Sequence, residues 1–129
     1  MRLAQLATTR TPLRLHEPRY NMLSYVYSTK YQNSNQWVLE SLAAAMAPPG
    51  QVETRAEAQR WLRSIGFQPP TVEISAATRL GARMFRANVA FDDHPYERRM
   101  AGQIDTITTD AVVRMARMVD PQARTMTVD

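Results

Sequence analysis

The Asn-Ser-Asn run that begins at Asn33 opens directly onto an apolar segment, and a Pro-Pro-Gly run ending at Gly50 closes that segment. The side-chain oxygen of Asn33 can cap the first turn, and Gln36, three residues later, can reach back as in a capping box. Neither proline can continue a helical hydrogen-bond ladder. These signals predict a helix from Ser34 to about Met46. Apolar side chains recur along it at helical spacing: Val38, Leu42, Ala45 and Met46.

A second helix has equally clear ends. Thr54 and Glu57 form a capping-box pair, and Gly66 stands where a helix often ends in a left-handed residue. The apolar face between them consists of Ala58, Trp61, Leu62 and Ile65. Two prolines follow at 69 and 70, and they force an extended connection.

The other elements carry shorter signals. Residues 71–74 and 101–108 favour strands, and 86–91 alternates as a half-buried strand does, so we expect 101–108 to pair antiparallel with 86–91. Residues 75–84 favour a helix, and 1–7 favour the end of one. Thr8 to Pro12 is a polar break, and Leu13 to Lys30 remains open. A last helix is expected to begin at a cap on Thr109 or Asp110, carry Val112, Ala116 and Val119, and stop before Pro121.

This order of elements predicts an α+β fold with three to four helices and a small antiparallel sheet. The 129 residues suffice for one domain, with residues 121–129 as a tail. No apolar stretch is long enough to span a membrane, so the sequence favours a soluble protein. The net charge of +4 comes from arginines spread along the chain, which argues against a clustered nucleic-acid surface.

Two segments carry candidate chemistry. Ser34 is expected at the start of a helix, where free N–H groups favour negative charge, and with no cysteine in the chain it is the available nucleophile there. Asp92, Asp93 and His94 could orient a base, so Ser34 and His94 are candidate catalytic residues. The alternative is a hairpin turn in which aspartates bond the backbone and Arg98 or Arg99 pairs with them. No metal-ligand spacing occurs, and we expect no metal or cofactor.

A resemblance adds to these observations. Asn33-Ser34-Asn35 followed by Trp37 resembles the helix start of permuted papain-like amidases and acyltransferases, in which a cysteine nucleophile stands at the position of Ser34. More closely, the motifs around Asn33 and at 91–99 resemble an uncharacterised bacterial family, domain-of-unknown-function family 2145, over about residues 13–119. The resemblance implies part of a papain-like fold and covers the C-terminal half of longer members. A missing N-terminal half with a signal peptide would place the protein in the periplasm.

Three functions remain open at this point. The favoured one is a non-catalytic papain-like domain that binds a peptide or a cell-envelope glycan. Its candidate binding residues are Asn33, Asn35, Trp37, Asp92, Asp93 and Arg98. The alternatives are a weak serine-dependent amidase or acyltransferase and a scaffold or regulatory domain that binds a protein. The apolar side chains of the tyrosine-bearing N-terminal segment and of the first long helix are expected to stay exposed in the monomer. Exposed apolar surface of this kind predicts a partner protein or a homo-oligomer.

Overall fold

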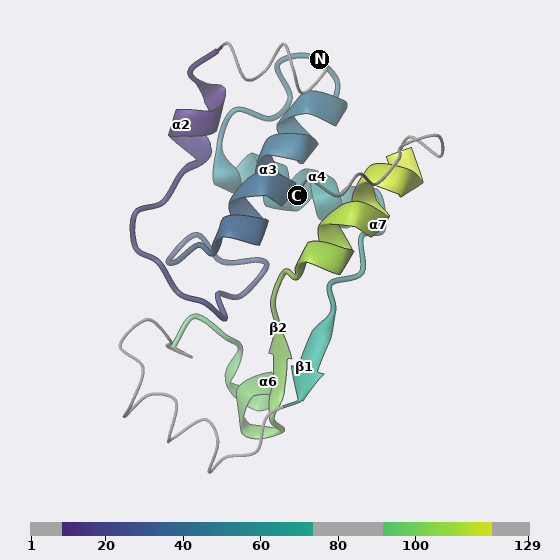
Figure 1. Cartoon of the computed structure of the whole chain (residues 1–129). Helices are drawn as coiled ribbons and strands as arrows, with labels where there is room; N and C mark the ends of the chain where they lie inside the picture. The colour runs from purple at the N-terminus through teal and green to yellow at the C-terminus, as the bar shows by residue number, and fades with distance from the viewer. Residues whose placement is uncertain (1–8, 74–91, 120–129) are drawn as a thin grey trace, which may run out of the picture.

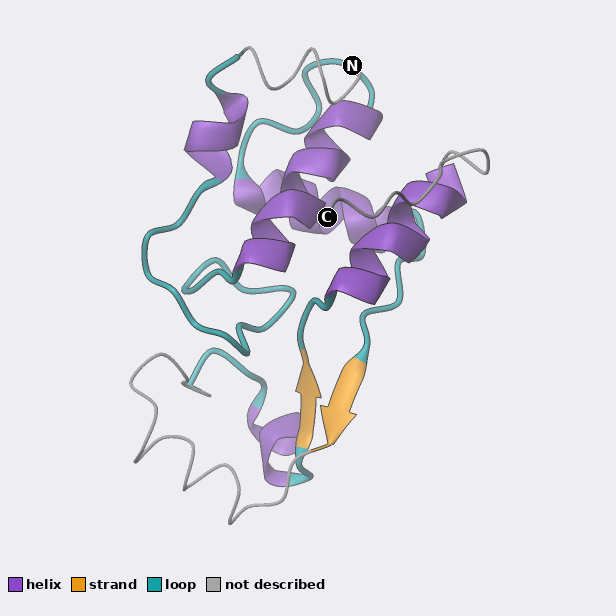
Figure 2. Cartoon of the chain, viewed as in Figure 1, coloured by secondary structure: helices purple, strands orange, loops and turns teal. Residues whose placement is uncertain are grey.

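The computed structural model of the chain describes residues 9–73 and 92–119 (Figure 1). In this part the fold is α+β, as predicted, with five helices and a two-stranded antiparallel sheet. The elements are α2 (Thr11–Leu15), α3 (Ser34–Met46), α4 (Arg55–Ser64), β1 (Thr71–Glu73), α6 (Tyr96–Met100), β2 (Gln103–Asp105) and α7 (Thr109–Val119). Figure 2 shows the three longest helices gathered in one body, with the short sheet and α6 extending from one end.

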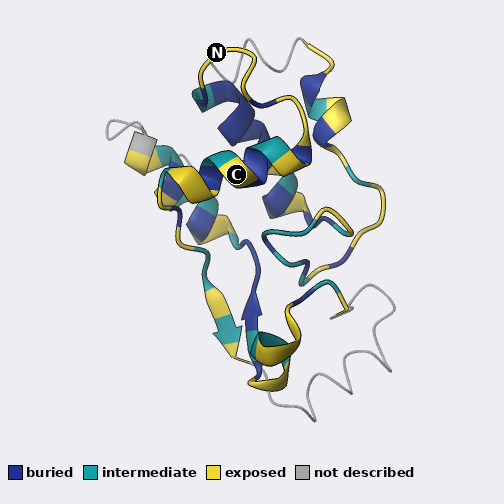
Figure 3. Ribbon diagram, turned by 180° about the vertical axis from the view of Figure 1, so that it is seen from behind, coloured by how far each residue is buried: buried dark blue, intermediate teal, exposed yellow. Residues whose placement is uncertain are grey.

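Helix α3 is the centre of the fold, because α2, α4 and α7 all contact it. Its predicted bounds, Ser34 to Met46, are confirmed. Its predicted apolar stripe is correct only in part. Val38 is 40% exposed, whereas Leu39 and Ala43 are fully buried. Several elements pack around α3, so its buried surface is wider than one stripe and includes every residue from Leu39 to Ala45. Figure 3 shows the helices coloured by burial.

Helix α4 has both of its predicted ends. The Thr54 hydroxyl accepts from the backbone N–H of Glu57, and the Glu57 carboxylate accepts from that of Thr54. At the other end Gly66 has a φ of +79°, and the N–H of Phe67 donates to the carbonyl of Leu62 at 3.0 Å. This is the Schellman arrangement, and its left-handed residue favours glycine. Ala58 and Leu62 are fully buried, while Trp61 and Ile65 lie partly at the surface.

The sheet has β1 antiparallel to β2, with Val72 opposite Ile104. Ile104 is fully buried and fixes the inner face of this small ribbon. In the described residues, the strand that pairs with β2 is thus β1. The sequence also predicts a strand at β1. The expected strand at 86–91, the expected helix at 75–84, the helix end at 1–7 and the tail at 121–129 lie outside the described residues.

Three local predictions need correction. A short helix, α2, begins at Thr11 within the segment predicted as a polar break, with Pro12 in its first turn, where a proline costs no hydrogen bond. The turn at 92–95 leads into helix α6 and not into a hairpin. Helix α7 is capped one residue early, since the Thr108 hydroxyl accepts from the N–H of Ala111 at 3.3 Å. Its buried face is centred on Ala111 and Met115, while Val112 and Ala116 are only partly buried.

Candidate functional site

The start of α3 has the predicted cap. The Asn33 side chain accepts a hydrogen bond from the backbone N–H of Gln36 at 2.7 Å, which places Ser34 at the first helical position. Ser34 is exposed there. The prediction that Ser34 lies in the first turn is therefore confirmed, and its hydroxyl lies at the positive end of the helix dipole.

The second half of the predicted capping box is replaced by a serine from another segment. The backbone N–H of Asn33 donates to the Ser24 hydroxyl oxygen at 3.1 Å, and that hydroxyl donates to the Gln36 side-chain carbonyl at 2.6 Å. The Gln36 amide then donates to the carbonyl of Tyr25 at 3.0 Å. Gln36 thus reaches the backbone of Asn33 through one inserted hydroxyl, and it ties α3 to the preceding loop.

Asn33 also connects α3 to the end of the sheet. Its amide nitrogen lies 3.1 Å from the carbonyl oxygen of Met22 and 3.2 Å from the hydroxyl of Thr106. The residue is only 6% exposed. The side-chain oxygen and the amide N–H groups of Asn33 are thus all hydrogen-bonded inside the protein. These bonds connect three segments of the chain.

The other candidate binding residues of this segment are engaged as well. The Asn35 side-chain oxygen accepts from the hydroxyl of Thr109 at 3.2 Å, which links the start of α3 to α7. The indole N–H of Trp37 donates to the carbonyl of Pro12 at 2.9 Å, and the ring meets His16 edge-on at 5.6 Å between centroids. Trp37 therefore joins α2 to α3.

The turn at Asp93 and His94 packs against the same loop. The N–H of Tyr25 donates to the Asp93 carboxylate at 2.6 Å, and the imidazole Nε2 of His94 lies 2.6 Å from the carbonyl oxygen of Leu23. A carbonyl can only accept, so Nε2 carries a proton. Both side chains are fully buried, with 3.6 Å between imidazole and carboxylate. Burial raises the pKa of Asp93, against the opposing effects of the Tyr25 N–H and the His94 ring.

Asp92 faces outward and pairs with the ammonium of Lys30, while its carboxylate also accepts from the Tyr31 hydroxyl at 3.2 Å. Burial acts to raise the pKa of Asp92, but these hydrogen bonds outweigh it, and the pKa lies below its usual value. Arg98 does not join this turn. Its guanidinium grips Asp105 with two hydrogen bonds, Nε to Oδ2 at 2.9 Å and Nη2 to Oδ1 at 2.6 Å. Of the two arginines expected to pair with the turn, Arg98 therefore does not, and pairing by Arg99 stays a prediction.

The two predicted motifs meet on one short segment. Leu23 holds His94, Ser24 holds the start of α3, and Tyr25 holds Asp93. Among the described residues no hydrogen bond joins Ser34 to His94, since the hydroxyl is at the surface and the imidazole is buried against a carbonyl. A catalytic role for this pair stays a prediction.

A buried ionic cluster lies behind this segment, and sequence reasoning missed it. The Glu40 carboxylate, 1% exposed, binds the guanidinium of Arg55 through both oxygens, at 2.7 and 3.3 Å. The amides of Gln32 and Gln59 donate to the same carboxylate at 2.6 and 2.8 Å. Burial raises the pKa of Glu40, and these donors oppose the rise. The one signal in the sequence is that Glu40 is the only charged residue of α3.

Arg55 extends this cluster to the loop. Its remaining donors reach the backbone carbonyls of Ser28, Thr29 and Tyr31 at 3.3, 3.0 and 3.0 Å. Each polar group is satisfied, as a buried charge requires. The cluster holds the loop after α2 against α3 and α4, and it leaves no side chain open to a ligand.

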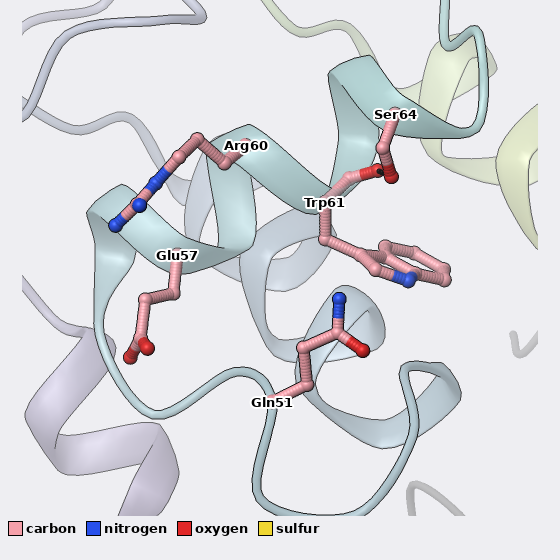
Figure 4. A pocket seen from close by; sticks show the side chains of 5 residues that line it. All are labelled: Gln51, Glu57, Arg60, Trp61 and Ser64. Atoms are coloured by element: carbon pink, nitrogen blue, oxygen red, sulfur yellow. Dashed lines mark hydrogen bonds between the residues drawn. The ribbon is translucent and has the colours of Figure 1, made fainter.

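The open polar surface lies instead on the outer side of α4. A hollow of about 460 Å³ there is lined by Gln51, Glu57, Arg60, Trp61 and Ser64 (Figure 4). In Figure 4 the Gln51 amide points from its loop toward the indole ring of Trp61, while Glu57 and Arg60 lie toward the other end. A second hollow, of about 290 Å³, is lined by Tyr27, Thr29, Ala56, Gln59, Arg60 and Arg63. Arg60 lines both.

Over residues 1–115 the chain matches the family described as "Uncharacterized protein conserved in bacteria (DUF2145)". It belongs to this family. The resemblance to this family, which the sequence motifs suggest, is thereby confirmed. The region that matches the DUF2145 family begins at residue 1, whereas the motifs suggest a start near Leu13. No curated protein and no solved structure matches the chain. The likeness to papain-like proteins and to the C-terminal half of longer relatives therefore stays a prediction.

Two further findings limit the site. Within residues 9–73 and 92–119 of the DUF2145 chain, no three acidic or histidine side chains are grouped as a metal ion would need. None of the helices in the same residues has the length and apolar character that crossing a bilayer requires. The expectation that the helix α3 is left uncovered is wrong, since α2, α4 and α7 contact it and its residues Leu39 and Ala43 are fully buried. The expected partner and homo-oligomer stay predictions.

Proposed function

We propose that this DUF2145 protein is a non-catalytic binding domain, and that it holds a glycan of the bacterial cell envelope in the hollow beside Trp61. The observation that carries the proposal is a contrast between two groups of polar side chains. In the predicted motifs, the side chains of Asn33, Trp37 and Asp93 are hydrogen-bonded to backbone groups within the protein. Those around Trp61 are open at the surface.

The donors of this hollow are uncommitted. In the described residues the Gln51 amide, the Arg60 guanidinium and the indole N–H of Trp61 have no hydrogen-bond partner, whereas the indole of Trp37 is bonded to a backbone carbonyl. The Ser64 hydroxyl donates to the carbonyl of Trp61 at 2.6 Å, which leaves its oxygen able to accept. A glycan offers both hydroxyl donors and acceptors, so it suits this mixture.

An apolar ring face accompanies these donors. Trp61 is half-buried, and α4 fixes it between the buried Ala58 and Leu62. A rigid aromatic ring provides a large contact area at low entropic cost, while its N–H supplies one hydrogen bond. The flat face of a sugar ring fits such a surface, with its hydroxyls directed to Gln51 and Arg60.

The proposal moves the ligand away from the segment around Ser34 and His94. Asn33, Asn35, Trp37, Asp93 and Arg98 would then serve the architecture of the domain. The papain-like fold remains a hypothesis within this proposal, and binding a cell-envelope glycan would place the domain outside the cytoplasm. The serine-dependent amidase is not favoured, because a serine is a weak nucleophile without a positioned base.

The experiment is a titration followed by nuclear magnetic resonance, with chitotetraose as the glycan probe. The two indole N–H signals make an internal control, because Trp61 lies in the hollow and Trp37 is bonded within the fold. We expect the sugar to shift the signal of Trp61 and leave that of Trp37 in place. Trp61→Leu should abolish binding, and Tyr96→Leu, a change at an exposed aromatic residue outside the hollow, should not.

A second titration uses the stem pentapeptide of peptidoglycan without its sugars. If this peptide shifts the Trp61 signal and chitotetraose does not, the domain binds peptides and the glycan proposal is wrong. If neither probe shifts it, the hollow is not a binding site for either class.

A further inference from the structure

We infer that the glycan is acidic, and that its carboxylate binds between Arg60 and Arg63 in the second hollow of α4. This inference rests on the proposed function, because Arg60 lines both hollows and one ligand would run from Trp61 across it. The second hollow, of about 290 Å³, has room for a carboxylate on a short side chain.

Arg63 is held in position for such a grip. Its guanidinium lies over the ring of Tyr27 at 3.9 Å from the centroid. The ring is itself fixed, since the Tyr27 hydroxyl lies 3.3 Å from the carbonyl oxygen of Phe67 and the Tyr25 ring meets it edge-on. A guanidinium held over an aromatic face can still donate N–H groups from its edge to a carboxylate.

Neither of the two arginines is in an ion pair in the part of the chain that the structure describes. The pKa of Glu57 is lowered first by the hydrogen bond from the N–H of Glu53, and the charge of Arg60 also acts on Glu57 and helps to lower it. Among the described residues neither Arg60 nor Arg63 has a carboxylate within ion-pair distance, in contrast to Arg55 and Arg98. Glu57, one turn before Arg60, directs its carboxylate to the N–H groups of Glu53 and Thr54 at 3.2 and 3.1 Å.

The spacing of the arginines favours one ligand group between them. Residues three apart on a helix are neighbours on its surface, so the side chains of Arg60 and Arg63 can converge on the same anion. The planar fork of arginine matches the two oxygens of a carboxylate better than a lysine would. The Gln59 amide, bonded to Ser28 and Glu40, forms a fixed wall of the hollow.

The test compares two disaccharides that differ by one acidic group. Chitobiose is neutral, and the peptidoglycan disaccharide of N-acetylglucosamine and N-acetylmuramic acid carries a lactyl carboxylate on one ring. We expect the acidic disaccharide to bind roughly tenfold tighter in titration calorimetry, a typical effect of charge-assisted hydrogen bonds in a partly exposed site.

Three variants locate the effect. Arg60→Gln and Arg63→Gln should each remove most of the preference for the acidic disaccharide. Arg114→Gln, on α7, makes the same change of net charge at an exposed arginine outside this hollow and should retain the preference. Thermal unfolding of each variant checks that the fold is intact, which we expect because the three arginines are exposed.

The outcomes separate the two proposals. If the parent binds both disaccharides equally, with the Trp61 signal shifting, the proposed function holds and the carboxylate site is wrong. A preference that survives in both Arg60→Gln and Arg63→Gln also overturns the site. If neither disaccharide binds but chitotetraose shifts the Trp61 signal, the carboxylate site is wrong and the proposed function holds; if chitotetraose does not bind either, both proposals fail.

Discussion

The carboxylate of Glu40 and the guanidinium of Arg55 form a bidentate ion pair in the interior, with one member on α3 and the other at the first position of α4. The pair is nearly inaccessible to solvent, at 1% and 7% exposure. It also fixes the loop before α3, through the carbonyls that Arg55 binds. The ion pair therefore has a structural role in the domain and is not part of a ligand site.

The first prediction concerns this pair. Arg55→Met should lower the free energy of unfolding by about 3–5 kcal/mol, because it leaves the Glu40 carboxylate buried without its partner charge. Urea denaturation measures the change. Arg114→Met, the same substitution at an exposed arginine of α7, is the control and should cost less than about 0.5 kcal/mol. Equal losses in the two variants would show that the pair does not stabilise the fold.

The second prediction concerns the hydroxyl that completes the cap of α3. Ser24→Ala should cost about 1–3 kcal/mol, since it leaves the N–H of Asn33 and the side-chain carbonyl of Gln36 buried without this partner. Asn33→Ala should cost at least the roughly 1 kcal/mol of an ordinary cap. Ser34→Ala, at the exposed neighbouring position, should change stability by less than about 0.5 kcal/mol. A cost for Ser34→Ala as large as that for Ser24→Ala would contradict this account.

The third prediction concerns catalysis. The parent and the variants Ser34→Ala and Ser34→Cys should show equal background rates on ester, amide and peptidoglycan substrates, because no base is hydrogen-bonded to position 34 in the described residues. His94→Gln should lower the melting temperature, since the buried ring is bonded to Leu23. His16→Gln, at an exposed imidazole, is the control. Activity gained by Ser34→Cys and lost again with His94→Gln would establish a disabled papain-like centre.

The fourth prediction concerns stability in acid. Burial acts to raise the pKa of Asp105, but hydrogen bonds from Arg98 and Thr71 outweigh it, so the pKa lies below its usual value of 3.8. Below about this pH the unfolded chain binds a proton at Asp105 before the folded chain does. The stabilisation by Asp105 is therefore complete above pH 3.8 and is lost as the pH falls through the folded pKa.

The measurement is the free energy of unfolding between pH 5 and 2, compared between the parent and Arg98→Gln. The parent should lose stability more steeply on acidification, because only there is the pKa of Asp105 held down by a guanidinium. Glu40, whose pKa burial raises, contributes with the opposite sign, but it is common to both proteins and cancels in the comparison. Arg114→Gln should behave as the parent does, and a parallel pH profile for Arg98→Gln would refute the role of the ion pair.

The elements with local signals were predictable. The bounds of α3 follow from Asn33 and the prolines after it, and those of α4 from its capping box and Gly66. Caps and breakers act on groups a few residues away, so sequence alone contains the whole interaction. The short helix α6 was missed, because a five-residue helix has too few turns to show a period.

The site depended on contacts between distant segments. Sequence placed Arg98 with the aspartates six and five residues before it, whereas the fold brings it to Asp105. It suggested Asn33, Trp37 and Asp93 as binding residues, and tertiary packing turned each of them toward a backbone group of another segment.

What the sequence determined by itself was the family, the α+β class and the ends of the two best-capped helices. The tertiary structure decided which polar side chains are open to a ligand. Gln32 and Gln51 are the same residue type, yet Gln32 is 2% exposed and bonded to Glu40, while Gln51 lies exposed at the hollow beside Trp61. The difference arises because a buried amide must satisfy its hydrogen bonds within the protein, and only the packing of distant segments determines which amides are buried.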